Sequence, residues 1–290
     1  MRWSRVAWLL TAVAVVASGC GSTPEPPAEP AAAPAAEPAR STGSAPSVGP
    51  ERADVGSAQR LRVEVLDRYP HDTGAFTQGL EIDDDVVYEG TGQYGESELR
   101  IVDLDTGAVR QRVSLPDTVF GEGITVLDDR VWQISWRDGI AYERDPETLA
   151  ERRQVRYEGE GWGICHDDAA DRLIMSDGTD QLTFRDPETF VATGTVSVTL
   201  DGGPLRDINE LECVGGAVWA NVWRTDRIVR IDPSSGQVAA QVDAAGLLTG
   251  AERAGTDVLN GIAAVSGTDE FLLTGKYWPT LFRVRFVPAS

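Results

Sequence analysis

The sequence predicts an all-β fold, a five-bladed β-propeller, because it repeats a turn motif, repeats a strand motif and lacks useful helical periodicity. The turn motif occurs as DLDTG at 103–107, DPET at 145–148 and 186–189, and DPSSG at 232–236. Its first aspartates are 42, 41 and 46 residues apart. Aspartate and proline favour tight turns in such motifs, and short strands with a period of roughly 40–50 residues are typical of propeller blades.

Each repeat contains three runs of residues that we expect to form strands, with a fourth strand before the next repeat. The first runs, which are mostly centred on a glycine, occur in phase at 77–82, 121–126, 161–166, 208–213 and 259–264. About ten residues later, the second runs follow at 86–92, 130–136, 172–178, 217–223 and 270–276. Third runs then lead into the turns. Five copies of the first run indicate five blades.

The end of the last repeat predicts how the ring closes. The run at 281–287 leaves little sequence for a further strand, whereas the run LRVEVLDRY at 61–69 precedes the first repeat. We expect this N-terminal strand to join the last blade as its outer strand and so close the ring. A β-sandwich is the alternative fold, but it would not produce five phased copies of one motif.

Residues 1–20 predict a secretory signal peptide. Arg2 and Arg5 precede an apolar run at 6–17, which is too short to span a bilayer as a stable helix, and small residues then lead to Cys20. This arrangement resembles the lipobox of bacterial lipoproteins, in which the cysteine is lipidated. We therefore expect export and a lipid anchor in the bacterial cell envelope, on its periplasmic or extracellular face. Simple secretion and a retained membrane anchor are the alternatives.

Residues 21–58 predict a disordered tether, and residues 59–290 the propeller domain. The tether holds 8 of the 16 prolines and almost no large apolar residues, so it cannot bury enough surface to fold. The chain carries a formal net charge of −20, which argues against nucleic acid and anionic lipid headgroups as ligands. We expect membrane contact only through the N-terminal lipid and, because a closed ring requires no partner, a monomer.

The first runs are the natural inner strands of the blades, because glycine permits close approach of backbones around a channel. The residues expected near this channel are Gln78, Glu122, Trp162, Asn209 and Asn260. Glu122 lies between two glycines, and partial burial there raises the pKa of a carboxyl toward the range useful for proton transfer. The alternative is that the amides and the glutamate at these positions join neighbouring blades by hydrogen bonds.

Two pairs of tryptophans occur at a spacing of four residues in the second runs. Trp132 and Trp136 form one pair, and Trp219 and Trp223 the other. Because alternate residues of a strand share one face, each pair lies on one side of its strand. We expect Trp132 and Trp219 to pack between blades, and Trp136 and Trp223, nearer the strand ends, to border a pocket.

Several chemistries lack their usual residues in this chain. The only histidines, His71 and His166, stand in unrelated contexts, so a catalytic zinc would lack its usual ligands. The acidic turn at 83–85 offers oxygen ligands for calcium, although a solvated loop explains it as well. Serine hydrolase motifs, P-loops and dinucleotide fingerprints are absent from the sequence. We expect no cofactor in catalysis, and a structural calcium stays open.

Eight motifs in order resemble the plant and bacterial type of glutaminyl-peptide cyclotransferase, also called glutamine cyclotransferase. They are FTQGL, FGEGIT, GWG, SDGT, NELE, ANVW, LNGIA and TGKYWP, and the match runs from about Tyr69 to Phe286. The resemblance implies a five-bladed propeller that converts an N-terminal glutamine to pyroglutamate and releases ammonia. It also implies a transferase unrelated to the zinc-dependent cyclases of animals.

The resemblance assigns roles to particular residues. It implies that Glu122 is the catalytic base and then acid, and that Lys276 and Asn209 complete the catalytic group. The implied substrate-binding residues are Phe76, Gln78, Phe120, Trp136, Trp162 and Trp223. Cys165 and Cys213 fall within one residue of the same place in consecutive repeats, which makes them a candidate disulfide in an exported protein.

Two other functions remain as alternatives. Propellers host many activities, so a non-catalytic propeller that binds peptides at the cell surface is one of them. The other is a calcium-dependent hydrolase similar to sugar lactonases, in which Glu122, Asn209 and Asn260 would converge on an ion.

Overall fold

The computed structural model describes residues 57–83, 86–127 and 129–289. The predicted signal peptide with Cys20 and almost all of the predicted tether lie outside the described residues. The chain divides into two compact units, 1–51 and 52–290, and the described residues belong to the second. These residues form strands and turns without a helix. Accordingly, this part of the chain has no helix long and apolar enough to cross a membrane.

Three four-stranded antiparallel sheets follow one another along the chain, each with its strands in chain order. The first sheet contains β2 (Thr77–Asp83), β3 (Val86–Thr91), β4 (Glu98–Val102) and β5 (Val109–Ser114). The second contains β6 (Gly121–Leu127), β7 (Arg130–Ser135), β8 (Ile140–Arg144) and β9 (Glu151–Arg156). The third contains β10 (Ile164–Asp167), β11 (Arg172–Ser176), β12 (Gln181–Arg185) and β13 (Ala192–Ser197).

The remaining long strands form one eight-stranded sheet in the order β16-β17-β18-β19-β1-β22-β21-β20. Its strands from the fourth repeat are β16 (Ile208–Val214), β17 (Ala217–Val222), β18 (Arg227–Ile231) and β19 (Val238–Asp243). The others are β20 (Leu259–Ala264), β21 (Glu270–Gly275), β22 (Thr280–Pro288) and the N-terminal β1 (Gln59–Pro70). Strand β1 pairs antiparallel with β22 and, over its first residues, parallel with β19. A short hairpin of β14 (Thr199–Leu200) and β15 (Gly203–Pro204) was not predicted.

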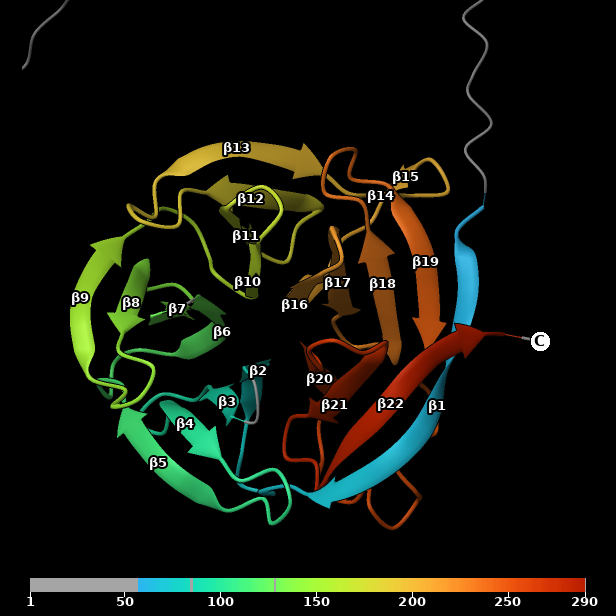
Figure 1. Cartoon of the computed structure of the whole chain (residues 1–290), viewed down its shortest axis with the longest axis horizontal. Coiled ribbons are helices and arrows are strands. Elements are labelled where there is room, and N and C mark those ends of the chain that lie inside the picture. Colours follow the sequence, from blue (N-terminus) through green and yellow to red (C-terminus); the bar gives the residue numbers. More distant parts are fainter. Residues whose placement is uncertain (1–56, 84–85, 128, 290) are drawn as a thin grey trace, which may run out of the picture. The chain divides into compact units, whose positions relative to one another are not determined.

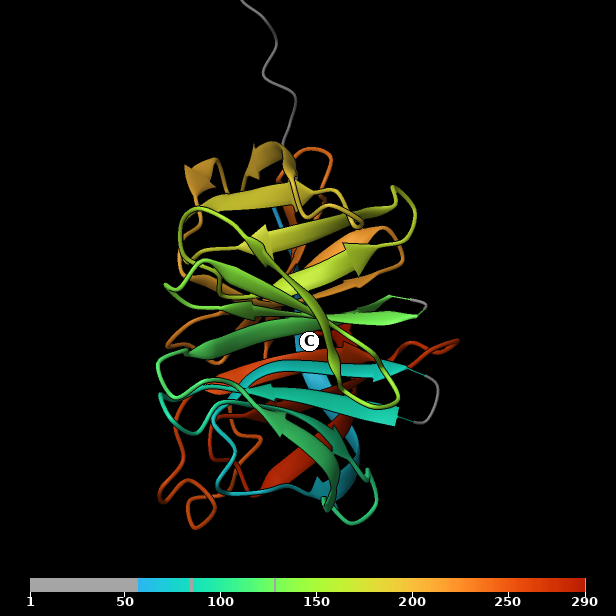
Figure 2. The same ribbon diagram turned by 90° about the vertical axis from the view of Figure 1, so that its left-hand side faces the viewer.

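Figure 1 shows that the sheets surround a common centre, with β2, β6, β10, β16 and β20 innermost. In the side view of Figure 2, the first three sheets follow one another as twisted layers, from teal to yellow. The described residues therefore form an all-β, propeller-like fold. Each predicted first and second run contains a strand of this arrangement.

The predicted aspartate turns are confirmed by their hydrogen bonds. In each turn the first aspartate accepts a bond from the backbone amide of a Thr or Ser two or three residues later, at 2.7–3.0 Å. The pairs are Asp103 with Thr106, Asp145 with Thr148, Asp186 with Thr189, and Asp232 with Ser234. Because the same bond recurs at the same place, the turns set a common register for the third and fourth strands of each repeat.

The inner strands carry β-bulges at the residues expected near the channel. The pairing register shifts between Thr77 and Gly79, Gly121 and Ile124, Ile208 and Leu211, and Leu259 and Ile262. Bulges re-aim side chains and bend a strand, and these four contain Gln78, Glu122, Asn209 and Asn260. In the third repeat, a Cβ at Gly163 would overlap the carbonyl oxygen of Asn209, so only glycine lets these backbones approach.

The apolar core lies between neighbouring sheets. Trp132 is fully buried and packs on Phe190 of the next repeat, with the ring centroids 4.8 Å apart. Trp219 is also buried and lies 5.3 Å from Phe271, centroid to centroid. Trp132 thus joins the second and third sheets, and Trp219 packs between the fourth and fifth repeats within the eight-stranded sheet, so both pack between repeats as their sequence positions predicted.

Candidate active site

A cavity of about 260 Å³ opens at the end of the molecule where the inner strands begin and the second strands end. Its lining residues are Phe76, Gln78, Gln93, Phe120, Glu122, Trp136, Trp162, Asn209, Trp223 and Lys276. Nine of these ten are the catalytic and substrate-binding residues named from the sequence. The structure brings all nine together, and their individual roles stay predictions.

The repeat explains why distant residues meet in this cavity. Trp136 follows β7 and donates its backbone amide to the carbonyl of Phe120, just before β6, at 2.9 Å. Trp223 follows β17 and makes the equivalent bond to Asp207 at 2.8 Å, and Lys276 after β21 bonds Val258 at 3.0 Å. The same backbone pairing therefore places a different side chain at the edge of the cavity in the second, fourth and fifth repeats.

Aromatic rings form most of the wall. Phe120 packs edge-on against Phe76 and Trp136, with centroid distances of 6.0 and 5.6 Å. On the other side, Trp162 meets Trp223 edge-on at 5.3 Å. Gly178 lies against the Trp162 indole, and a Cβ there would overlap the ring. Such walls suit the methylene groups of a ligand and exclude water.

Glu122 is the acidic group of the cavity. It is 5% exposed, and burial raises the pKa of its carboxyl well above the ordinary value. The nearby Lys276 charge opposes this rise in pKa and Glu160 adds to it. Among the described residues, no side chain or amide forms a hydrogen bond or ion pair with the Glu122 carboxylate. This carboxyl is therefore free to exchange a proton with a ligand.

Lys276 is the basic group of the cavity. It is 4% exposed, and its Nζ lies 4.4 Å from the ring centroid of Phe76. Burial lowers the pKa of Lys276, while Glu122 raises it. The ring face stabilises the ammonium in this dry setting, so the site holds a cation and a carboxyl without a direct ion pair.

Amide side chains complete the polar lining. The Nδ2 of Asn260 donates to the carbonyl of Thr77 at 3.0 Å and to Oε1 of Gln78 at 3.2 Å. This leaves the NH₂ group of Gln78 to donate into the cavity. The Oδ1 of Asn209 is buried and has no hydrogen-bond partner among the described residues, so it offers an acceptor to a ligand.

Asn260, which was expected near the channel, and Glu210 beside Asn209 join neighbouring sheets. Asn260 does not line the cavity and links β20 to β2 through the bonds just described. Glu210 accepts backbone amides from Ile262 at 2.9 Å and Leu80 at 3.4 Å. For Asn260 these bonds agree with the alternative interpretation, hydrogen bonding between neighbouring repeats.

Gln93 and Glu160 escaped the sequence analysis. Gln93 lines the cavity from the loop after β3, with an unusual backbone φ of 95°. Glu160 precedes the GWG motif, and its Oε2 accepts both Trp136 Nε1 and Trp162 Nε1. Polar loop residues outside the repeated strands carry no periodic signal, and the position of Glu160 directly before the GWG motif is the one signal that could have found it.

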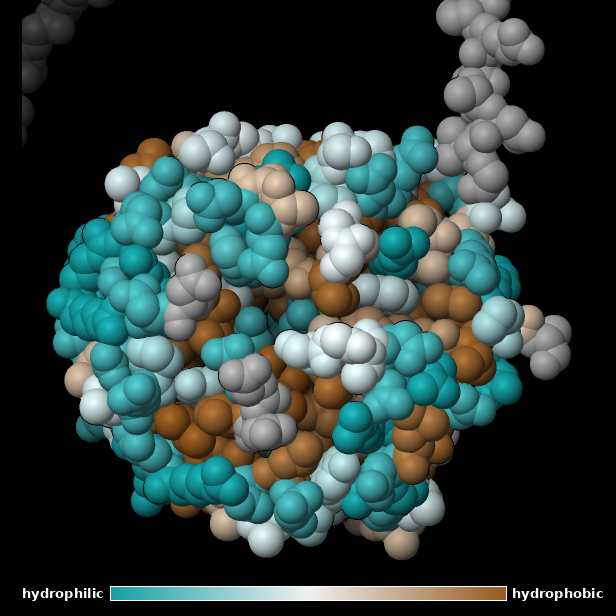
Figure 3. Space-filling model, viewed as in Figure 1, coloured by the Kyte–Doolittle hydropathy of each residue, from teal (hydrophilic) through white to brown (hydrophobic). Residues whose placement is uncertain are grey.

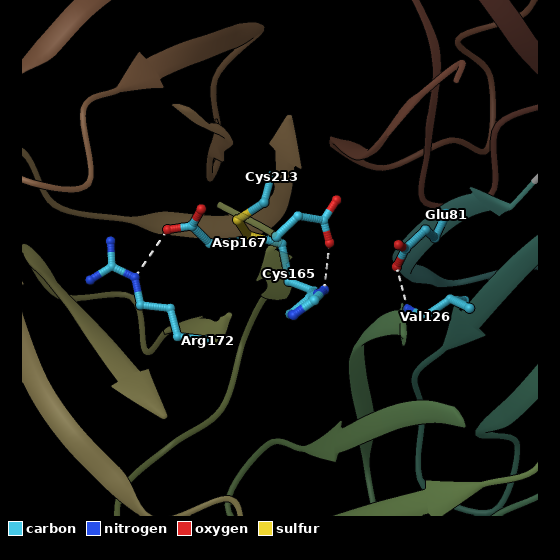
Figure 4. The surroundings of a disulfide bond; sticks show 8 residues. Glu81, Val126, Cys165, Asp167, Arg172 and Cys213 are labelled. Atoms are coloured by element: carbon cyan, nitrogen blue, oxygen red, sulfur yellow. Dashed lines mark hydrogen bonds and ion pairs between the residues drawn. A yellow bond between two sulfur atoms is a disulfide. The ribbon is translucent and has the colours of Figure 1, made fainter. Parts of the chain in front are cut away.

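The opposite end of the inner strands carries a disulfide between Cys165 of β10 and Cys213 of β16. Figure 4 shows the bond near Asp167 and Arg172, which form an ion pair at 3.0 Å. Figure 3 shows a hollow with hydrophilic residues near the middle of this face, and Glu81, His166, Asp168 and Glu212 line a pocket there.

The described His, Cys, Asp and Glu side chains do not gather into a metal site. Across residues 57–83, 86–127 and 129–289, no group of three or more of these side chains is arranged to hold a metal ion. The acidic turn named from the sequence is only partly covered, because residues 84 and 85 lie outside the described residues.

The fold and cavity define a class of protein: an all-β, propeller-like domain with a buried carboxyl in an aromatic pocket at the channel end. A family model described as glutamine cyclotransferase matches residues 39–286. The chain is 39% identical over 234 residues to a glutaminyl-peptide cyclotransferase of Arabidopsis thaliana, covering 79% of this chain and 72% of the relative.

A solved structure agrees with this match. The crystal structure of Myxococcus xanthus glutaminyl cyclase superposes with a TM-score of 0.73 and 35% identity, over 81% of this chain and all of that one. The chain belongs to the glutamine cyclotransferase family.

Proposed function

We propose that this protein is a glutaminyl-peptide cyclotransferase, an acyltransferase that converts the N-terminal glutamine of peptides or proteins to pyroglutamate with release of ammonia. One observation carries the proposal: a single aromatic cavity unites Glu122, Lys276 and Asn209, the catalytic group that the family resemblance implies. The names of the two relatives point to the same reaction.

The reaction is intramolecular. The substrate's α-amine attacks the carbonyl carbon of its own side-chain amide, and the new C–N bond closes a five-membered ring. The C–N bond to the amide nitrogen then breaks, and that nitrogen leaves as ammonia. The protein's main task is to hold the folded conformer in which amine and amide meet, and the walls formed by Phe76, Phe120, Trp136 and Trp162 suit the glutamine methylenes.

Glu122 moves the proton in this scheme. As a carboxylate it accepts a proton from the attacking amine, and it then donates that proton to the departing nitrogen. The raised pKa of Glu122 brings it closer to that of an α-amine, about 8, which favours transfer in both directions. The carboxylate has no competing partner among the described residues.

The tetrahedral intermediate carries negative charge on the former amide oxygen. Lys276 and the NH₂ group of Gln78 are the donors in the cavity that can stabilise this oxygen. The Oδ1 of Asn209, which lacks a partner, accepts a hydrogen from the substrate amine or amide and so orients it. We propose that this route requires no metal ion.

The architecture in the proposal is a closed five-bladed propeller. The eight-stranded sheet divides into one blade of β16 to β19 and another of β20, β21, β22 and β1, which join the three four-stranded sheets. Antiparallel pairing of β1 with β22 then closes the ring with the N-terminal strand. We further propose that Cys20 carries the lipid that anchors an exported, monomeric protein.

One assay tests the activity. The purified chain is incubated with a short peptide that begins with glutamine, with and without a chelator, and the loss of ammonia is followed by mass spectrometry. We expect conversion that is unchanged by the chelator. Binding of the peptide without a mass change would support the non-catalytic propeller, and activity abolished by the chelator would support the calcium-dependent alternative.

A further inference from the structure

Glu160 connects two walls of the candidate active site that belong to different sheets. Its Oε2 accepts the indole N–H of Trp136 at 2.8 Å and that of Trp162 at 3.1 Å. Trp136 follows β7 of the second sheet, and Trp162 precedes β10 of the third. A single oxygen atom therefore fixes two indoles relative to each other.

A second set of contacts holds Glu160 itself in place. Its Oε1 accepts a hydrogen bond from Nε of Arg137 at 2.8 Å. The Arg137 guanidinium also lies 3.8 Å from the ring centroid of Trp136, so cation, carboxylate and indole form one unit. Although burial raises the pKa of Glu160, bonds from Trp162, Arg137 and Trp136 lower it more, and the carboxylate stays ionised at neutral pH.

We infer that Glu160 is a positioning residue of the active site that sets the two tryptophan walls. The inference rests on the proposed function and extends it to a residue that does not line the cavity. The indole N–H is the only hydrogen-bonding group of each tryptophan side chain. Loss of the shared acceptor allows the Trp136 side chain to rotate. The cavity then no longer has one fixed shape to hold the folded glutamine.

The electrostatic part depends on the groups that face Glu122. They are Lys276 after β21, Glu160 before Trp162, and the Tyr157 hydroxyl, which bonds the carbonyl of Ser135. The Lys276 charge lowers the pKa of Glu122, whereas the Glu160 charge raises it. Removal of the Glu160 charge therefore lowers the pKa of Glu122 and extends the base activity to lower pH.

Two substitutions separate shape from charge. Glu160→Gln keeps an oxygen acceptor for the indoles but removes the charge, so the acid limb of the kcat/KM profile should move to lower pH with little change in KM. Glu160→Ala removes both, so KM for a glutamine-initiated peptide should also rise about tenfold. Glu158→Gln is the matched control, because Glu158 is exposed on the same loop and should leave both parameters at the wild-type values.

A spectroscopic measurement tests the positioning without activity. In wild-type protein the indole N–H resonances of Trp136 and Trp162 should move together as Glu160 is titrated, and both should shift in Glu160→Ala. If wild-type protein forms no pyroglutamate, the proposed function fails, and these resonances still decide the positioning role. Indole resonances that do not respond to Glu160, or an active Glu160→Ala variant with the wild-type KM, would overturn the inference. If the Glu160→Ala variant does not fold, measurements on the Glu160→Gln variant test the inference instead.

Discussion

Lys276 is the only lysine among 26 basic residues, and the structure gives it a specific environment. Its ammonium is nearly buried and lies over Phe76 in the cavity that Glu122 also lines. A compact ammonium on a flexible stem fits such a space, whereas a planar guanidinium requires a wider one with several acceptors. An arginine-rich chain therefore has a physical reason to retain a lysine here.

The fit of Lys276 predicts the effect of a charge-preserving change. Lys276→Arg should fold normally but lose about 10²-fold in kcat/KM, because a displaced donor no longer meets the developing oxyanion. Steady-state kinetics with a glutamine-initiated peptide measure this loss. Wild-type turnover in the variant would mean that the lysine is a coincidence of composition.

The charge of Lys276 predicts a change in pH dependence. Burial raises the pKa of Glu122 and Lys276 lowers it, so Lys276→Met should raise the pKa of Glu122 further. Since Glu122 must be ionised to accept a proton, the acid limb of kcat/KM should move to higher pH. A profile measured over pH 5 to 9 tests the sign, and a shift to lower pH would contradict the assigned electrostatics.

At the scale of elements, a buried polar network ties the start of the first repeat to the turn after Lys276. His71 bonds the carbonyl of Trp278 at 2.7 Å and Oε1 of Glu89 at 3.0 Å. Glu89 also accepts the Thr77 hydroxyl at 2.7 Å and lies 3.7 Å from Arg100. The network thus fixes both the strand that carries Gln78 and the segment that presents Lys276.

Removal of Glu89 leaves His71 without its buried charged partner, while Arg100 keeps Glu98 and Asp72. Glu89→Ala should lower the free energy of unfolding by about 3–5 kcal/mol, as measured by denaturant unfolding. Glu96→Ala, a change of an exposed glutamate in the same repeat, is the control and should have little effect. Equal stability of the two variants would show that the network does not stabilise the fold.

This network also gives stability a pH window. Burial raises the pKa of Glu89, but His71 and other partners lower it more, so this pKa is depressed in the folded protein. The stability that ionised Glu89 contributes is therefore lost as pH falls through the depressed pKa. Burial lowers the pKa of His71, but Glu89 raises it more. The stability that protonated His71 contributes is therefore complete below about pH 6.5 and is lost as pH rises through the raised pKa. The advantage of wild type over Glu89→Ala should therefore be largest in mildly acidic solution.

The disulfide links inner strands of neighbouring sheets, far along those strands from the cavity. Replacement of both Cys165 and Cys213 by serine should lower the free energy of unfolding by about 2–4 kcal/mol and leave KM nearly unchanged. Unfolding and kinetic measurements on the same samples distinguish the two effects. A variant as stable as wild type, or one with a disrupted cavity, would contradict this description.

At the scale of the whole molecule, β1 is the strand on which the proposed ring closure depends. It pairs with β22 over nearly its full length and touches β19. A chain that begins after residue 70 exposes both partner edges and should lose cooperative unfolding, whereas one that begins at residue 57 should unfold as the full chain does. Cooperative unfolding of the shorter chain would show that closure is dispensable.

Much of this molecule could be predicted from its repeats. The turns at Asp103, Asp145, Asp186 and Asp232 follow from local chemistry, and Glu122 stands out because glycines flank it. Asn260 lies on an inner strand as expected but outside the cavity lining, because its side chain bonds Thr77 and Gln78 of another repeat, a contact that the sequence does not reveal. Gln93 and Glu160 were missed because their roles arise only when neighbouring repeats meet.

The central claim is that Glu122 transfers the proton in pyroglutamate formation. The most direct measurement compares wild type and Glu122→Gln on one glutamine-initiated peptide, with ammonia loss followed by mass spectrometry and folding checked by thermal unfolding. We predict a rate about 10²–10⁴-fold lower in the variant, with unfolding at least as cooperative as in wild type. A folded variant that retains most of the wild-type rate would contradict the claim.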